Sequence, residues 1–143
     1  MDLRQVAPRY FVSPQIGPED IPDLVSAGIT RILCNRPDDE VPPSHCAEVI
    51  RAAAETTGIT FAQQPLTMQR IVPEVVAANR ALGADTEDVT LAYCTSGTRS
   101  CLAWALGQAG RMTVQDILDA TRAAGYQFEH LKPMLDHRFT EGS

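Results

Sequence analysis

Apolar residues along the chain gather into short runs separated by amphipathic stretches. Four of these runs predict β-strands, at residues 9–13, 29–35, 59–63 and 88–94. The run at 29–35 is rich in β-branched and aliphatic residues, which is typical of a strand buried inside a sheet. Between the runs, apolar residues recur at helical spacing; an example is Cys46, Val49, Ile50 and Ala53. The pattern therefore alternates between strand and helix.

Proline and glycine mark where the predicted helices begin and end. Helices are expected to begin at Pro18, near Ser44 and at Pro73, and the first three to end at Gly28, Gly58 and Gly83. Another is expected over 99–109, one more after the capping residue Thr113, and a short last one carrying Leu131, Met134 and Leu135. The β-α-β-α-β-α-β-α order predicts an α/β fold with a mainly parallel sheet of four to five strands flanked by helices. A length of 143 residues fits one domain, residues 1–143.

Charge and composition exclude several classes of function. The net charge of −6 argues against binding nucleic acids or anionic membranes, because both need a basic surface. No apolar run is long enough for a bilayer span and the first residues lack a signal-peptide core, so we expect a cytoplasmic protein. Its four cysteines are then expected to be reduced. With only His45, His130 and His137, we expect no metal site and no cofactor, and the oligomeric state stays open.

Two cysteines end predicted strands, Cys34 and Cys94, and the carboxyl ends of parallel strands are where α/β folds build their sites. Cys94 is followed by Thr95, Ser96, Gly97 and Thr98, and then by Arg99 and Ser100 at the start of a helix. Successive N–H groups in such a turn can form an anion-binding nest, to which the helix N-terminus adds partial positive charge. Gly97 permits a positive φ or a close backbone approach.

These features favour a thiolate at Cys94. A free thiol has a pKa of about 8.5, and helix N-termini and nearby cations lower it. Arg99 could stabilise the thiolate or hold an anionic substrate. The side chains of Ser96, Thr98 and Ser100 could contact that substrate, and Thr95 and Gly97 could contact it through their N–H groups. A buried structural cysteine is the usual alternative, but it does not explain the whole loop. The sequence thus predicts Cys94 and Arg99 as catalytic residues.

The segment Tyr93-Cys94-Thr95-Ser96-Gly97-Thr98-Arg99-Ser100 resembles the active-site loop of rhodanese-type sulfurtransferases. Over roughly residues 1–136, the chain also resembles the phosphatase-like domain of bacterial beta-lactamase-hydrolase-like proteins. Segments that carry this second resemblance are 8–15 (PRYFVSPQ), 34–38 (CNRPD), 73–76 (PEVV) and the Cys94 loop. That family implies a fold similar to the dual-specificity phosphatases.

The two resemblances imply different reactions. The cysteine phosphatase signature has five residues between Cys and Arg, whereas this chain has four, and Tyr93 stands where the signature has His. The shorter loop favours a cradle for a single sulfur, so the leading prediction is a sulfurtransferase. In that reaction, Cys94 takes sulfane sulfur from thiosulfate or a small persulfide and passes it to a thiol or cyanide-like acceptor.

Two alternatives stay open. One is a cysteine phosphatase that forms a phosphocysteine, in which Asp38 or Asp39 could protonate the leaving oxygen. The other is an anion-binding module whose thiolate is reversibly oxidised. Arg36 is a candidate for binding an anionic substrate in each case. Cys34 could accept sulfur or form a disulfide with Cys94, although burial in the core is the commoner fate of such a residue.

Overall fold

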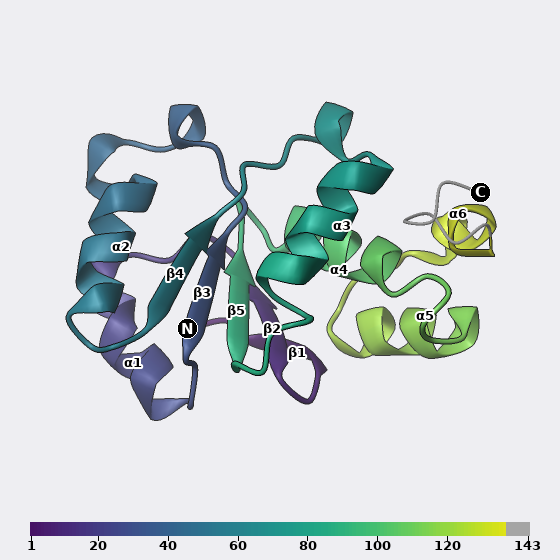
Figure 1. The fold of residues 1–143 in the computed structure, drawn as a ribbon, viewed down its shortest axis with the longest axis horizontal. Helices are drawn as coiled ribbons and strands as arrows, with labels where there is room; N and C mark the ends of the chain where they lie inside the picture. The colour runs from purple at the N-terminus through teal and green to yellow at the C-terminus, as the bar shows by residue number, and fades with distance from the viewer. Residues whose placement is uncertain (137–143) are drawn as a thin grey trace.

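The computed structural model describes residues 1–136 and shows one five-stranded sheet between two groups of helices (Figure 1). Its strand order is β1-β2-β5-β3-β4. Only the edge pair, β1 and β2, is antiparallel, and the pairs β2–β5, β5–β3 and β3–β4 are parallel. The strands are β1 (Arg4–Ala7), β2 (Tyr10–Ser13), β3 (Arg31–Cys34), β4 (Thr60–Gln63) and β5 (Thr90–Tyr93). The predicted mainly parallel sheet is confirmed, with the strand before Cys94 at its centre.

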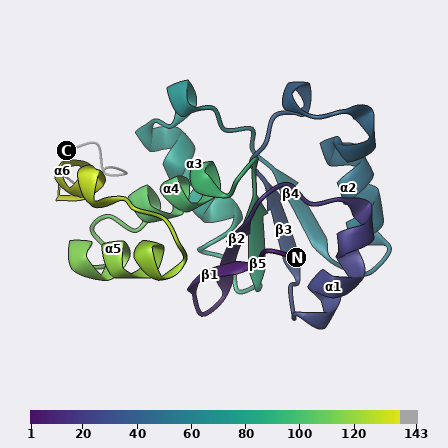
Figure 2. The same cartoon turned by 180° about the vertical axis from the view of Figure 1, so that it is seen from behind.

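Helices cover both faces of the sheet, as Figure 2 shows from behind. Ile32, Leu91 and Tyr93 face α1 and α2 in one core, while Val12, Leu33 and Ala92 pack in the other against the helices from α3 onward. The α-helices are α1 (Ile21–Ser26), α2 (Ala47–Glu55), α3 (Pro73–Leu82), α4 (Thr98–Gly107), α5 (Val114–Ala123) and α6 (Lys132–Asp136). Among the described residues, no helix is long and apolar enough to cross a membrane.

Two local features differ from the sequence prediction. The strand β1 was not predicted, because Arg4-Gln5-Val6-Ala7 contains one buried apolar residue, Val6, and no apolar run. The segment before α2 forms two short 3₁₀ turns, Asp38–Glu40 and Pro43–His45, so α2 begins at Ala47 rather than near Ser44. One of the three histidines, His137, lies outside the described residues.

Candidate active site

The Cys94 loop lies at the carboxyl edge of the sheet and is anchored to neighbouring segments. The N–H of Cys94 donates to the carbonyl of Ser13 at 3.4 Å, and the carbonyl of Thr95 accepts from the N–H of Gln15 at 3.3 Å. From the far side, the Tyr126 hydroxyl donates to the carbonyl of Ser96 at 3.1 Å. Cys94 itself is 1% exposed. The loop is therefore held from β2 on one side and from the segment after α5 on the other.

Gly97 shapes the turn that leads into α4. Its φ of +90° lies in the left-handed region, which favours glycine. A Cβ at this position would stand 2.2 Å from the Tyr126 hydroxyl oxygen, so a side chain would also collide with the anchor of the loop. The carbonyl of Gly97 accepts the N–H of Cys101 and so begins the hydrogen bonding of α4.

Several N–H groups of the loop are left without partners. Within residues 1–136, no backbone carbonyl or side chain accepts from the N–H groups of Thr95, Ser96, Gly97, Arg99 or Ser100. The N–H of Thr98 is turned back onto Ser96 Oγ at 3.4 Å. Unpaired N–H groups in one turn at the start of a ten-residue helix have the arrangement of an anion nest, the name used for them below. The binding role of the loop stays a prediction.

Arg99 folds back beside the loop. Its Nη2 donates to Thr95 Oγ1 at 2.6 Å and its Nη1 to the carbonyl of Leu66 at 2.6 Å. The same two nitrogens meet the carboxylate of Glu40 at 2.6 and 3.0 Å. The Glu40 carboxylate raises the pKa of Arg99, and the Cys94 thiol acts in the same direction. Arg99 is thus placed between the predicted nucleophile and a carboxylate that the sequence analysis did not single out.

Glu40 is held by two arginines. Arg36 donates through Nε to Glu40 Oε1 at 3.4 Å and through Nη2 to the Glu40 carbonyl at 2.9 Å. Hydrogen bonding from Arg99 lowers the pKa of Glu40, and Arg36 adds to this effect. The side chain of Glu40 is 32% exposed and that of Arg99 is 13% exposed. A carboxylate therefore occupies the guanidinium fork that an anionic substrate would use.

The remaining predicted residues lie nearby but are bound to other groups. Asp38 Oδ1 accepts the N–H of Ala47 at 2.8 Å and so caps the start of α2. The Cys34 thiol donates to the carbonyl of Arg36 at 3.5 Å, and burial raises its pKa. Cys34 is the last residue of β3, and Cys94 comes directly after the neighbouring strand β5. Both cysteines are free thiols. Neither Asp38 nor Cys34 contacts the anion nest through a hydrogen bond, and their auxiliary roles stay predictions.

A network of buried side-chain amides contacts Ser100, just after Arg99, and sequence reasoning missed it. Asn35 Nδ2 donates to Ser100 Oγ at 3.0 Å, and Asn79 Nδ2 donates to Asn35 Oδ1 at 2.7 Å. Asn79 also donates to Gln64 Oε1 at 2.8 Å. Asn35, Asn79 and Ser100 are at most 2% exposed. Because Asn35 uses the oxygen of Ser100 as an acceptor, the Ser100 hydroxyl proton is left for another partner.

Comparison with known proteins identifies the family. The model of the phosphatase-like domain of beta-lactamase hydrolase-like proteins matches residues 2–111. The chain belongs to this family. A beta-lactamase hydrolase-like protein from Xylella fastidiosa (strain 9a5c) is 27% identical over 140 residues, which are 96% of this chain and 32% of that protein. The chain thus spans about a third of the length of the curated relatives it matches.

Solved structures agree with the family assignment. A candidate phosphatase from Neisseria meningitidis is 33% identical, with a TM-score of 0.83 over 96% of this chain and 99% of that one. More distant structures share the fold of this phosphatase-like domain. The catalytic core of the PP-IP phosphatase SIW14 from S. cerevisiae has a TM-score of 0.68 at 18% identity, over 95% of this chain and 86% of that one. P. aeruginosa TpbA has a TM-score of 0.65 at 18% identity, over 100% of this chain and 85% of that one.

The prediction of a sulfurtransferase was wrong. It depended mainly on the four residues between Cys94 and Arg99, together with Tyr93 and the resemblance of the loop to rhodaneses, and gave the fold less weight. The family match and the candidate phosphatase from Neisseria meningitidis point instead to phosphatase-like chemistry, which was the first alternative. Loop length was a poor guide because the cradle is closed by groups from outside the loop. Arg99 is oriented by Glu40 and Leu66, and the turn is braced by Tyr126.

Proposed function

We propose that this domain is a cysteine-dependent phosphatase that forms a phosphocysteine at Cys94. One observation carries the proposal: within a phosphatase-like fold, a cysteine opens a nest of unpaired N–H groups whose far end is the guanidinium of Arg99. The unpaired N–H groups can meet the three non-bridging oxygens of a phosphate ester. The match to the phosphatase-like domain family and the likeness to a candidate phosphatase from Neisseria meningitidis support the same chemistry.

In the first step, the Cys94 thiolate attacks phosphorus, a sulfur–phosphorus bond forms, and the bond to the leaving oxygen breaks. Arg99 holds two equatorial oxygens through its planar fork while charge shifts onto the leaving oxygen. In the second step, water attacks the phosphocysteine and releases inorganic phosphate and the thiolate. The residues that bind in both steps are Thr95, Ser96, Gly97, Thr98, Arg99 and Ser100, with Arg36 at the rim.

Glu40 is the carboxylate best placed to protonate the leaving oxygen. Asp38 is engaged as the cap of α2, and the segment 64–72 after β4 contains no acidic residue. Glu40 already reaches Arg99 and Thr95. A phosphate dianion that binds Arg99 displaces this carboxylate and, by like-charge repulsion, favours its protonated form. The proton goes to the leaving oxygen in the first step and is recovered from water in the second.

Steady-state hydrolysis of an aryl phosphate tests this function. Cys94→Ser should abolish phosphate release, and Arg99→Lys should reduce kcat/KM strongly although the charge is kept. Glu40→Gln should slow phenyl phosphate far more than p-nitrophenyl phosphate, because only the poorer leaving group needs the proton. Asp38→Asn serves as the matched control, with an acid removed from the same turn. Turnover that persists in Cys94→Ser would rule out the phosphocysteine, and equal slowing of both esters would rule out Glu40 as the acid.

A further inference from the structure

One pocket of the described residues lies away from the Cys94 loop. It has a volume of about 230 Å³ and is lined by Ala7, Pro8, Arg9, Tyr10, Ala84, Trp104, Gln108 and Met112. Arg9 and Tyr10 stand where β2 begins, whereas Cys94 follows the end of β5, and these strands run parallel with Tyr10 opposite Thr90. The pocket therefore opens at the amino edge of the sheet, at the opposite end from the anion nest.

Two nearly buried side chains leave polar atoms without partners in this pocket. Trp104 is 4% exposed and Tyr10 is 3% exposed. Among residues 1–136, no hydrogen-bond partner meets the indole nitrogen of Trp104, the hydroxyl of Tyr10 or the side-chain amide of Gln108. These atoms are not among the side-chain atoms shut off from solvent, so they line the open space of the pocket, where water or a ligand atom can meet them.

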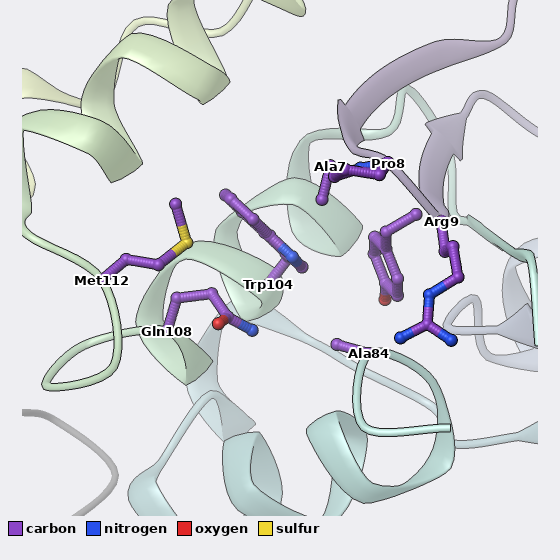
Figure 3. A pocket seen from close by; sticks show the side chains of 8 residues that line it. Ala7, Pro8, Arg9, Ala84, Trp104, Gln108 and Met112 are labelled. Atoms are coloured by element: carbon purple, nitrogen blue, oxygen red, sulfur yellow. The ribbon is translucent and has the colours of Figure 1, made fainter. Parts of the chain in front are cut away.

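The polar groups converge and are dominated by donors. Figure 3 shows the nitrogen-bearing edge of Trp104, the amide of Gln108 and the guanidinium of Arg9 turned toward the same space beside Ala84. Arg9 gives Nη1 to the carbonyl of Glu87 at 3.0 Å, and its Nε and Nη2 have no partner within the described residues. An indole N–H and a guanidinium can only donate. The complementary ligand therefore presents acceptors, best of all a negative charge.

The local charge agrees with an anion. Asp85, next to the pocket residue Ala84, is already paired with Arg80 at 3.3 Å and with Arg111 at 2.6 Å, so it adds no uncompensated negative charge there. The rest of the wall is apolar and is formed by Ala7, Pro8, Ala84 and the Met112 side chain. At about 30 Å³ per water molecule in the liquid, the volume accepts a ligand the size of one substituted ring.

We propose that this pocket is a second binding site, separate from the Cys94 loop, for a small monocyclic carboxylate. The ring lies against Trp104 and the apolar wall, and the carboxylate accepts from Arg9, with the indole N–H and the Gln108 amide beside it. The lining residues come from the hairpin of β1 and β2, from the segment after α3, and from α4 with the segment that follows it.

The fluorescence of Trp104 tests the proposal, because it is the single tryptophan of the chain. Benzoate should change its emission saturably, and the uncharged isostere benzamide should bind about tenfold more weakly, the typical difference for one charge-assisted hydrogen bond. Arg9→Gln should bring benzoate down to the affinity of benzamide. Arg51→Gln, which removes the same charge on α2, should leave both affinities unchanged.

A second measurement separates this pocket from the anion nest. Benzoate binding at the pocket should persist in Arg99→Gln and should shift the NMR signal of the Met112 methyl group, assigned with Met112→Leu. An emission change without saturation, equal affinities for benzoate and benzamide, or benzoate binding that survives Arg9→Gln would overturn the proposal. Benzoate binding that is lost in Arg99→Gln would place the ligand at the Cys94 loop instead and overturn it as well.

Discussion

Glu40 competes with phosphate for Arg99, and replacing it by glutamine measures that competition. In the free protein, the two guanidinium nitrogens meet the Glu40 carboxylate at 2.6 and 3.0 Å. Hydrogen bonds to charged groups contribute about 1.5–3 kcal/mol each when shielded from water. Because the Glu40 side chain is 32% exposed, solvent screening reduces the competing interaction to about 1 kcal/mol in total. Phosphate must displace this interaction before it can bind Arg99.

We therefore expect Glu40→Gln to bind inorganic phosphate or vanadate about fivefold more tightly at neutral pH, which is the factor for about 1 kcal/mol. Calorimetric titration gives the affinity directly, without turnover. Glu48→Gln is the matched control, since Glu48 is a surface carboxylate that pairs with Arg51 on α2. Unchanged or weaker phosphate binding in Glu40→Gln, together with an unchanged Glu48→Gln, would refute the view that Glu40 occupies the anion site.

Three further predictions concern stability and the loop. Gly97→Ala should abolish phosphate binding in calorimetric titration, because a Cβ there meets Tyr126. The control is Gly28→Ala, which has a similar φ of +87° but open space around it; it should lower the free energy of unfolding by only about 1–2 kcal/mol and keep phosphate binding intact. Equal effects of both substitutions would reduce Gly97 to a simple turn residue. Asp38→Ala should lower the free energy of unfolding by about 1 kcal/mol through loss of the cap on α2, and an unchanged thermal midpoint would contradict that role. Arg99 lowers the pKa of Glu40, so the ion pair of Glu40 and Arg99 should stabilise the fold at pH values above 4.5, the ordinary pKa of a glutamate. This stabilisation should be lost as the pH falls through the lower pKa that Glu40 has in the folded protein. If the difference in unfolding free energy between wild type and Glu40→Gln does not narrow on acidification, the ion pair does not stabilise the fold.

Local patterns predicted the fold well where the chain carries apolar runs. Residues 29–35 and 88–94 are such runs, and their strands lie side by side at the centre of the sheet. The edge strand β1 lacks this signal, because one face of it is polar and only Val6 is buried. Its pairing with β2 comes from the tight turn at Pro8 and Arg9, a tertiary feature that apolar periodicity does not report.

The candidate site divides in the same way. Cys94, Gly97 and Arg99 lie within one turn, so their spacing alone predicted the anion-binding loop. Glu40 could not be found by spacing, because 59 residues separate it from Arg99 and only the fold brings them together. Its signal was present in a weaker form, because Glu40 directly follows the two candidate acids Asp38 and Asp39. The amides of Asn35 and Asn79 were hidden for the same reason, 44 residues apart in the chain.

The central claim is that Cys94 becomes phosphorylated during turnover. Rapid acid quenching of the protein with excess aryl phosphate, followed by intact-mass and peptide analysis, measures this directly. The account predicts one added phosphoryl group on the peptide that carries Cys94, formed in an initial burst together with one equivalent of the released phenol. The same treatment of Cys94→Ser should give neither the adduct nor the burst. Turnover of the ester with no phosphoryl group on Cys94, or no turnover of any phosphate ester by the folded protein, would contradict the account.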